Sequence, residues 1–231
     1  MNLIIIPSLI RCINKSLSYS DTRSEYSPHE RYEQLLKTIA SVKEKIPNPY
    51  IVLLECSKDI EEYEKILISN VNEYINYYHT NPEVISAVES IYKGYGESLT
   101  LYTFLKKHFQ GKNTNDNHDK IYYDKIDNRY ENIFKISGRY FLNTRFNYNK
   151  FNNDNNNFRC YTLSNMVTTR LYKIHKKYFD LYITNFIPLI YECSRGRSIE
   201  DIIATNLPYK HIDYLGVSGY IAVNKNEFID E

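Results

Sequence analysis

Two basic residues flank a short turn near the middle of the chain, in segment 135–140 (sequence KISGRY). The turn follows an apolar run, so Lys135 and Arg139 are expected around the carboxyl end of a strand. Arginine offers a planar fork to phosphate oxygens and lysine adds a point charge, while Gly138 lets a ligand approach the backbone near Ser137. The pattern predicts a diphosphate site. The alternative is a strand end with solvated charges.

Other common catalytic patterns are missing from the sequence. The first apolar run continues into Pro7 and Ser8 without a Gly-x-Gly-x-x-Gly turn, and no Gly-x-x-x-x-Gly-Lys-[Ser/Thr] loop is present. Segment 216–219 (GVSG) misses the Gly-x-Ser-x-Gly spacing of a hydrolase elbow by one residue. The six histidines form no His-x-x-x-His pair. These absences disfavour P-loop and dinucleotide-binding proteins, catalytic triads and zinc sites.

Apolar runs alternate with helical patterns through the first two thirds of the chain. Strands are predicted at 3–6, 50–54, 74–78 and 133–136. Ser27-Pro28-His29-Glu30 has the pattern of a helix start, and this helix ends before Pro47. Further helices are predicted at 60–67, at 81–91, and at 99–109 after a break at Gly94 and Gly96. The alternation predicts an α/β fold with a mostly parallel sheet flanked by helices.

The last third of the sequence has a mixed pattern. Segment 111–119 is predicted to be a polar loop, and the asparagine-rich segment 143–157 an excursion or mobile loop. Strands are expected at 158–163 and 169–172, a helix at 179–191, a second helix capped by Ser198, and a final strand at 215–223.

Composition limits the class of protein. The 231 residues, 42% hydrophobic and 25% charged, suit one globular domain over 1–231. A net charge of +1 without a basic block gives no indication of a nucleic-acid partner. The run 3–6 is too short to span a membrane. Four scattered cysteines without a Cys-x-x-Cys pair suit reduced thiols, so we expect a cytoplasmic protein.

Several short motifs together resemble the nucleotide-binding half of GT-A type glycosyltransferases. They are 19–24 (YSDTRS), 30–41 (ERYEQLLKTIAS), 53–57 (LLECS), 93–97 (KGYGE) and 134–142 (FKISGRYFL). The likeness is to small transferase-like proteins of large DNA viruses and of some bacterial surface-glycan clusters. It covers about residues 1–145, which implies a nucleotide-sugar-binding half there and an acceptor-side half at 146–231. A virus would place the protein in the host cytoplasm.

The resemblance implies which residues hold the nucleotide sugar. The loop after the first strand and the end of the second would bind the nucleoside, with Glu55 accepting from ribose hydroxyls. The remaining residues implied by the motifs, including three arginines held in reserve for the diphosphate, are Pro7, Ser8, Arg11, Arg23, Arg31, Lys93, Glu97 and Arg145. For Lys93 and Glu97 the alternative is a pair of helix-breaking glycines followed by an ordinary capping glutamate.

The sequence departs from the family where a metal site would be. Metal-dependent members carry Asp-x-Asp after the fourth strand, but Ser137-Gly138-Arg139 stands there. We therefore predict no cofactor, with Lys135 and Arg139 stabilising the leaving diphosphate in place of an ion. The rival is Asp124-x-x-Asp127, which could hold Mg²⁺ or Mn²⁺ if the strand register differs from the predicted one; a solvated loop is the other interpretation.

The resemblance also implies a carboxylate that accepts the proton of the acceptor hydroxyl. Glu200 and Asp201 resemble the family's x-Glu-Asp element, and Glu192 is the next candidate. Acidic residues in a first helical turn are also ordinary partners of the helix dipole. Some of the 24 tyrosines could stack against sugar rings in an acceptor groove, although most of them must be core or surface residues.

The predicted function is a glycosyltransferase. It would move a sugar from a UDP-, GDP- or CMP-linked donor to a glycan or glycoconjugate acceptor, as a monomer or an oligomer. The alternative is a non-catalytic relative that binds a nucleotide sugar or glycan, or scaffolds a glycan-assembly complex. A sugar-phosphate nucleotidyltransferase would require a Gly-rich signature after the first strand, and the sequence lacks it.

Overall fold

The computed structural model describes residues 1–109, 129–161, 166–205 and 207–231. The strands of its main sheet are, in spatial order, β3 (Glu73–Asn76), β2 (Pro49–Glu55), β1 (Asn2–Ser8), β4 (Asn132–Ile136), β7 (Leu171–His175), β6 (Asn156–Phe158) and β8 (Tyr209–His211). The first four are parallel to one another, and β7 runs antiparallel to β4. The predicted α/β fold with a mostly parallel sheet is confirmed.

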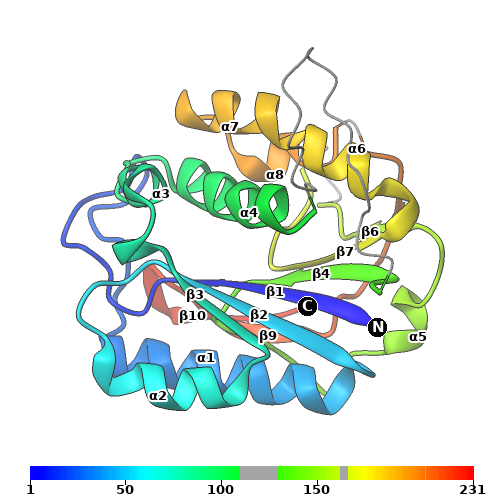
Figure 1. Ribbon diagram of the computed structural model, residues 1–231, viewed down its shortest axis with the longest axis horizontal. Coiled ribbons are helices and arrows are strands. Elements are labelled where there is room, and N and C mark those ends of the chain that lie inside the picture. The colour runs from blue at the N-terminus through cyan, green and yellow to red at the C-terminus, as the bar shows by residue number, and fades with distance from the viewer. Residues whose placement is uncertain (110–128, 162–165, 206) are drawn as a thin grey trace, which may run out of the picture.

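Helices cover both faces of this sheet (Figure 1). One face carries α1 (Pro28–Lys45) and α2 (Glu61–Asn70). The other face carries α3 (Pro82–Val88), α4 (Lys93–Phe109), α6 (Phe179–Thr184), α7 (Phe186–Ser194) and α8 (Ile199–Ile202). None of the described helices is long and apolar enough to cross a membrane.

The alternating side chains of β1 explain why the sheet is covered twice. Leu3 and Ile5 belong to the apolar core under α3, α4, α6 and α7, whereas Ile4 and Ile6 belong to the core against α1. All four side chains are fully buried. A continuous apolar strand of this kind is stable only between two layers, because successive side chains point to opposite faces.

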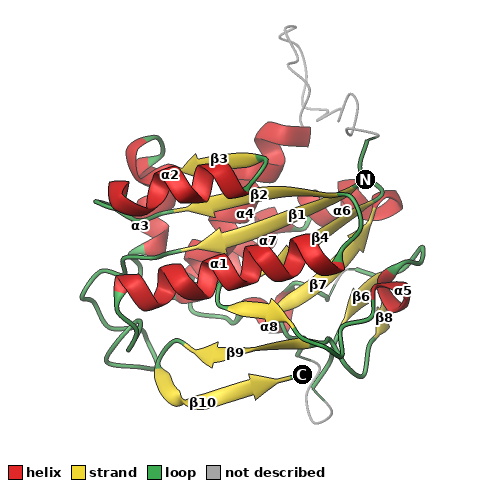
Figure 2. Cartoon of the chain, turned by 90° about the horizontal axis from the view of Figure 1, so that it is seen from below, coloured by secondary structure: helices red, strands yellow, loops and turns green. Residues whose placement is uncertain are grey.

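A small second sheet lies beside α1 (Figure 2). It has the order β10 (Asn224–Asp230), β9 (Val217–Ile221) and β5 (Tyr140–Leu142), with antiparallel pairing throughout. The prediction of one final strand at 215–223 is therefore incomplete, since the chain turns and returns as β10. This hairpin brings residues 221–223 back toward the end of β1, beside the site described below.

Local signals placed most helix starts correctly. Ser27 and Glu30 form the predicted capping box: the Glu30 amide donates to Ser27 Oγ (3.2 Å) and the Ser27 amide donates to Glu30 Oε2 (2.7 Å). Asn81 caps α3 and Ser198 caps α8 through their side chains. The single helix predicted at 179–191 is two consecutive helices, α6 and α7.

The predicted break at Gly94 and Gly96 is wrong, because α4 begins at Lys93 and runs through both glycines. A Cβ atom at Gly96 would lie 2.7 Å from Val88 Cα. The absence of a side chain at this glycine therefore allows α3 and α4 to pack closely. Its effect is to set the amino end of α4 beside the end of α3, and this end of α4 forms part of the site.

The asparagine-rich segment 143–157 is structured, contrary to the predicted excursion. It contains α5 (Tyr148–Phe151) and the first residues of β6. The fully buried Lys173 of β7 donates to the backbone oxygens of Asn153 (2.6 Å) and Asn155 (2.5 Å). Desolvation lowers the pKa of Lys173 to about 7. Backbone oxygens that accept from a buried lysine, together with the buried Phe151, hold this segment in place, and its asparagine-rich composition did not reveal either contact.

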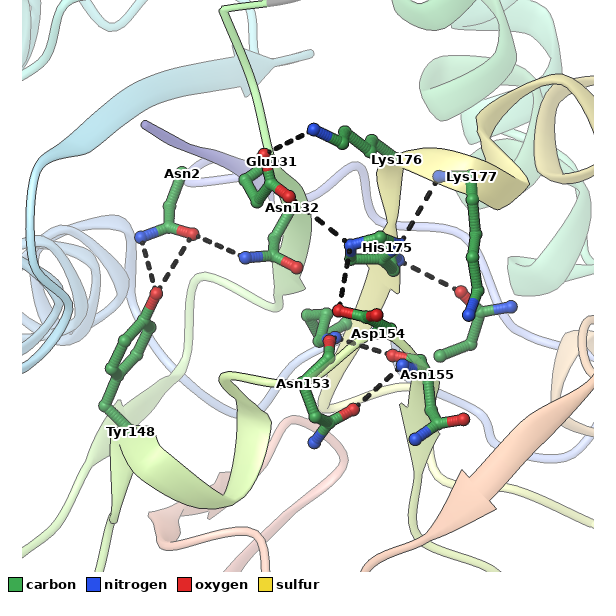
Figure 3. A network of polar contacts seen from close by, with 12 residues as sticks. Asn2, Glu131, Asn132, Tyr148, Asn153, Asp154, Asn155, His175, Lys176 and Lys177 are labelled. Atoms are coloured by element: carbon green, nitrogen blue, oxygen red, sulfur yellow. Dashed lines mark hydrogen bonds and ion pairs between the residues drawn. The ribbon is translucent and has the colours of Figure 1, made fainter.

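A polar network surrounds this segment at the amino end of β4 (Figure 3). His175 lies 3.5 Å from Glu131 and 3.7 Å from Asp154, and Asn132 donates to Asn2 (2.9 Å). Ordinary structural contacts thus account for the charges at this end of the sheet. The predicted strand at 158–163 is β6, shifted to Asn156–Phe158; residues 162 and 163 and the predicted loop 111–119 lie outside the described residues.

Candidate functional site

A cavity opens beyond the carboxyl ends of β1, β2 and β4. It encloses about 1410 Å³, including the part open to solvent. Its walls come from segments far apart in the sequence: the ends of these strands, the amino end of α4, the residues before β7, the start of α8 and the β9–β10 turn. Ligands of open parallel sheets bind at this edge, because loops and helix amino ends gather there. We call it the first cavity.

Two cations at the first cavity have neither an ion-pair partner nor a side-chain hydrogen bond among the described residues. Arg139 follows β4 and Lys93 begins α4, and both lie on the cavity wall. Arg139 stacks over the Tyr140 ring, with 5.5 Å from the guanidinium carbon to the ring centre. Arg139 lies close enough to Lys93 for its charge to lower the pKa of the lysine. Two unpaired cations in one concave site favour an anionic ligand.

The ionisation of Lys93 is perturbed by this position. Lys93 is exposed at the cavity wall, but protein groups surround its ammonium on the inner side. Loss of hydration, with the charge of Arg139 acting in the same direction, lowers the pKa of Lys93 to about 8. The amino end of α4, whose dipole also favours an anion, lies at the same wall. An anionic ligand would raise this pKa again, because it favours the charged form of the lysine.

Lys135 is not available to a ligand, in contrast to its predicted role. Its side chain is fully buried. The ammonium pairs with Glu97 and donates to Ser137 Oγ (2.9 Å) and to the Thr169 backbone oxygen (2.6 Å). One ion pair and two hydrogen bonds thus surround the ammonium within the protein. Lys135 therefore links α4, the turn after β4 and the residues before β7 beneath the site, and it does not line the cavity.

Glu97, one turn into α4, is kept ionised by this lysine. Burial opposes ionisation, but the ammonium groups of Lys135 and Lys93 outweigh it, so the pKa of Glu97 lies below its ordinary value. The residue lines the first cavity. Its carboxylate is a fixed acceptor for hydroxyl donors, and its low pKa makes it a poor proton acceptor.

Glu200 brings a second carboxylate to the same cavity. Thr169 Oγ1 donates to Glu200 Oε1 (2.9 Å), and Ser198 Oγ donates to Oε2 (2.6 Å). These two hydrogen bonds fix the orientation of the carboxylate at the cavity wall. Asp201 is exposed and lies outside the cavity, and Glu192 of α7 pairs with Arg197 (3.5 Å) in the loop that follows this helix. Of the three predicted acidic candidates, the structure places only Glu200 at the cavity.

Glu55 is buried under the site and does not line the cavity, so the predicted contact with ribose does not fit its position. Its Oε1 accepts from the amides of Ile10 (3.2 Å), Cys56 (3.0 Å) and Ser57 (2.9 Å), and from Ser57 Oγ (2.5 Å). A carboxylate with this many donors ties the loop after β1 to the end of β2. Glu55 thus shapes the cavity from below.

Arg23 and Arg31 line the first cavity, and each also hydrogen-bonds to the loops around it. Arg23 donates to the backbone oxygens of Val88 (2.9 Å), Glu89 (3.0 Å) and Ser90 at the end of α3. Arg31 donates from Nε to the Leu9 oxygen (2.6 Å). Burial lowers the pKa of both residues. They carry positive charge to the cavity wall while holding its loops in place.

Two predicted arginines lie away from the cavity. Arg11 pairs with Glu62 (3.2 Å) on the surface, and Arg145 pairs with Asp230 of β10. Pro7, Ser8, Ser137 and Gly138 do line the first cavity. Gly138 serves packing there, because a Cβ atom would lie 3.0 Å from Leu35 Cδ1 and 3.4 Å from the Pro7 oxygen.

The structure adds wall residues that sequence reasoning missed. Arg170 precedes β7, pairs with Glu231 (2.5 Å), and lines the cavity with Thr168 and Tyr161. These residues reach the site because β7 pairs antiparallel with β4, an arrangement that the predicted parallel order did not include. Tyr19 stands in a motif noted in the sequence and is 63% exposed at the cavity wall.

A second cavity adjoins the first. It encloses about 680 Å³, again including space open to solvent. Tyr19, Lys93, Glu97 and Glu200 line both cavities. The remaining walls are the residues before and at the start of α4 and the loop between α7 and α8. The four shared residues thus form a junction between two hollows.

No group of three or more potential metal ligands occurs within the described ranges. Asp124 and Asp127, the predicted alternative for a divalent ion, lie outside them.

No family model and no curated protein matches this sequence. Solved structures with a similar arrangement include the galactosyltransferase LgtC with donor and acceptor sugar analogues, at 12% identity and a TM-score of 0.46 over 89% of this chain and 69% of that one. Glycosyltransferase GlyE from Streptococcus pneumoniae is 12% identical with a TM-score of 0.47. The match covers 91% of this chain and 44% of the GlyE chain. The cytidylyltransferase LicC from Streptococcus pneumoniae is 9% identical with a TM-score of 0.46. The match covers 95% of this chain and 94% of the LicC chain. These likenesses assign no activity to the chain.

Proposed function

We propose that this protein is a glycosyltransferase that transfers a sugar from a nucleotide-linked donor to a glycan or glycoconjugate acceptor. One observation carries the proposal: Lys93 and Arg139, which make neither ion pairs nor side-chain hydrogen bonds among the described residues, line the same cavity as the oriented carboxylate of Glu200. A leaving diphosphate needs positive groups that are already in place. An attacking hydroxyl needs a proton acceptor. The first cavity offers both.

The donor would lie across the carboxyl ends of the central strands. Its diphosphate would sit between Lys93 and Arg139, with the amino end of α4 adding its dipole. Pro7, Ser8 and the loops held by Arg23 and Arg31 would enclose the nucleoside. The ionised Glu97, at the junction of the cavities, would accept hydrogen bonds from hydroxyls of the donor sugar.

We further propose that the fixed cations replace a divalent ion. The proposal rests on Lys93 and Arg139, which line the first cavity and form no ion pair within the described residues, so that their charges are available to a ligand. Lys135, for which the same role was predicted, would act only through Glu97. The predicted cytoplasmic location and the viral relationship stay predictions.

Nucleotide release from UDP-, GDP- and CMP-linked sugars, with and without EDTA, tests this function. We expect turnover on one donor class that survives EDTA and falls about 10²–10³-fold in Arg139→Ala, the usual loss when one group that stabilises developing charge is removed. Arg145→Ala is the matched control, because Arg145 pairs with Asp230 outside the cavity. It should leave turnover unchanged.

Each other outcome has a defined meaning. Donor binding without turnover would contradict the enzyme and favour the non-catalytic relative. Turnover that EDTA abolishes and Mn²⁺ restores would contradict metal independence and return attention to Asp124 and Asp127. Unchanged turnover in Arg139→Ala would show that the diphosphate does not bind beside this arginine.

A further inference from the structure

The second cavity has the composition of a carbohydrate site. Tyr19 and Tyr92 supply aromatic walls, while Ser198, Glu200 and Lys93 supply polar groups. Sugar rings combine apolar C–H faces with hydroxyl groups, so they match aromatic surfaces bordered by a few oriented polar atoms.

Tyr92 is held in place by a glycine that has no room for a side chain. Gly196 follows α7 with φ of +95°, and a Cβ atom there would lie 2.8 Å from Tyr92 Cε1. The Gly196 amide donates to the Cys193 oxygen (3.1 Å), which fixes the loop at the end of α7. The Tyr92 amide donates to Ser90 Oγ (3.2 Å). The glycine therefore lets the backbone approach the ring edge and support it.

Glu200 lies where the two cavities meet, with each carboxylate oxygen held by one donor. Thr169 Oγ1 approaches from the β7 side and Ser198 Oγ from the start of α8. A carboxylate oxygen has two lone pairs, so one on each oxygen stays open to a further donor. A hydroxyl group in the second cavity can therefore donate to Glu200 while its oxygen faces the first cavity.

We propose that the second cavity is the acceptor subsite, and that it takes one sugar ring whose apolar face rests on Tyr92 while a hydroxyl group donates to Glu200. The proposal rests on the transferase function given above. In a direct displacement, the acceptor O–H bond breaks and its proton passes to Glu200. The oxygen forms a bond to the anomeric carbon as the carbon–oxygen bond to the diphosphate breaks. That bonding pair leaves on the diphosphate, beside Lys93 and Arg139.

Methyl glycosides of glucose, galactose, mannose and N-acetylglucosamine are suitable probes, because each presents a single ring. In wild-type protein, at least one should accelerate nucleotide release above the rate of donor hydrolysis by water. Tyr92→Ala should raise KM for that glycoside about tenfold, the order expected for loss of an aromatic contact. Donor hydrolysis without the glycoside should stay within about twofold, because Tyr92 does not line the first cavity.

Two further variants separate ring stacking from a structural effect. Tyr92→Phe keeps the ring and should keep KM near the wild-type value. Gly196→Ala displaces the ring and should raise KM as Tyr92→Ala does. Tyr191→Ala, which removes a tyrosine 60% exposed on α7 and outside both cavities, is the matched control and should change nothing.

The outcomes distinguish the two proposals. If wild-type protein binds none of the donors, the proposed function fails. If donor hydrolysis proceeds but no glycoside accelerates it, or if Tyr92→Ala leaves KM for the glycoside unchanged, the acceptor subsite fails while the donor site stands.

Discussion

Lys135 and Glu97 form an ion pair beneath the junction of the two cavities, with the lysine side chain fully buried and the glutamate side chain 14% exposed. The pair joins β4 to α4, which are distant in the chain. Ser137 Oγ and the Thr169 oxygen complete the lysine's partners. Because Thr169 also donates to Glu200, this one ammonium is linked to both carboxylates of the site.

Removing the lysine charge should destabilise the protein strongly. Lys135→Met leaves the mostly buried Glu97 without its ion-pair partner. Breaking a buried pair by removing one partner costs about 3–5 kcal/mol. Urea unfolding measures the change. The double variant Lys135→Met/Glu97→Met should recover most of the loss, because it leaves no unpaired buried charge.

The comparison for this prediction is Lys176→Met, which removes an exposed pair with Glu131 (2.8 Å). Such surface pairs contribute about 0–1 kcal/mol. Equal unfolding midpoints for Lys135→Met and Lys176→Met would show that the Lys135 pair stabilises nothing, contrary to the structure.

Nucleotide affinity should fall with rising pH because of Lys93. Its pKa of about 8 means that the free protein loses this positive charge between about pH 7.5 and 9. A bound diphosphate favours the ammonium form, so binding should take up protons in this window. Titration calorimetry with UDP, in two buffers of different ionisation enthalpy at pH 8.5, measures that uptake.

Lys93→Arg provides the comparison, since a guanidinium stays charged throughout this range. Its UDP affinity should vary little from pH 7.5 to 9.5, and its proton uptake at pH 8.5 should vanish. The same pH dependence in Lys93→Arg as in the wild type would assign the titration to another group.

Glu200→Gln should impair transfer and spare donor binding. The amide keeps the shape of the side chain but cannot accept a proton, and loss of a general base lowers rates about 10²–10⁴-fold. Steady-state transfer rates and UDP affinity, measured together, test this. Asp201→Asn and Glu192→Gln alter carboxylates outside the cavity and should transfer at wild-type rates. A slow Asp201→Asn would mean that the acidic residue of the site has been misassigned.

Much of the fold could be predicted because its signals are local. The apolar runs of β1, β2 and β4 identify buried strands, and Ser27 with Glu30 identifies the start of α1. The antiparallel pairing of β7 with β4 and the β9–β10 hairpin depend on contacts between distant segments. A periodicity within one segment carries no information about such pairing.

The sequence predicted which residues lie near the site better than it predicted what each residue does there. The sequence placed Lys135 and Arg139 at one strand end, but their roles differ because side chains alternate along the strand and turn away after it. Lys135 enters the core and Arg139 faces the cavity. Glu55 ends β2 as expected, yet the loop after β1 closes over it. Which charges are already partnered follows from packing, and packing is set by residues far apart in the sequence.

Cys12 offers a chemical measure of donor binding. It lines the first cavity and is half-buried, near the guanidinium groups of Arg23 and Arg31. Burial raises the pKa of Cys56 and of Cys193 to about 12, so these two thiols should resist alkylation at pH 7.5. In a Cys160→Ser background, N-ethylmaleimide should therefore label mainly Cys12, and mass spectrometry of the digested protein identifies the site.

A saturating nucleotide sugar of the accepted class should slow the labelling of Cys12 at least about tenfold, because the ligand covers the wall on which the thiol lies. The Arg139→Ala variant shows whether the protection of Cys12 comes from donor bound in the first cavity or from a general effect of the donor on the mobility of the protein. At the same donor concentration, its weaker binding should leave Cys12 nearly as reactive as in the free protein. Labelling at equal rates with and without donor in the wild-type background would contradict binding in the first cavity, since a nucleotide sugar that fills this cavity covers the wall on which Cys12 lies.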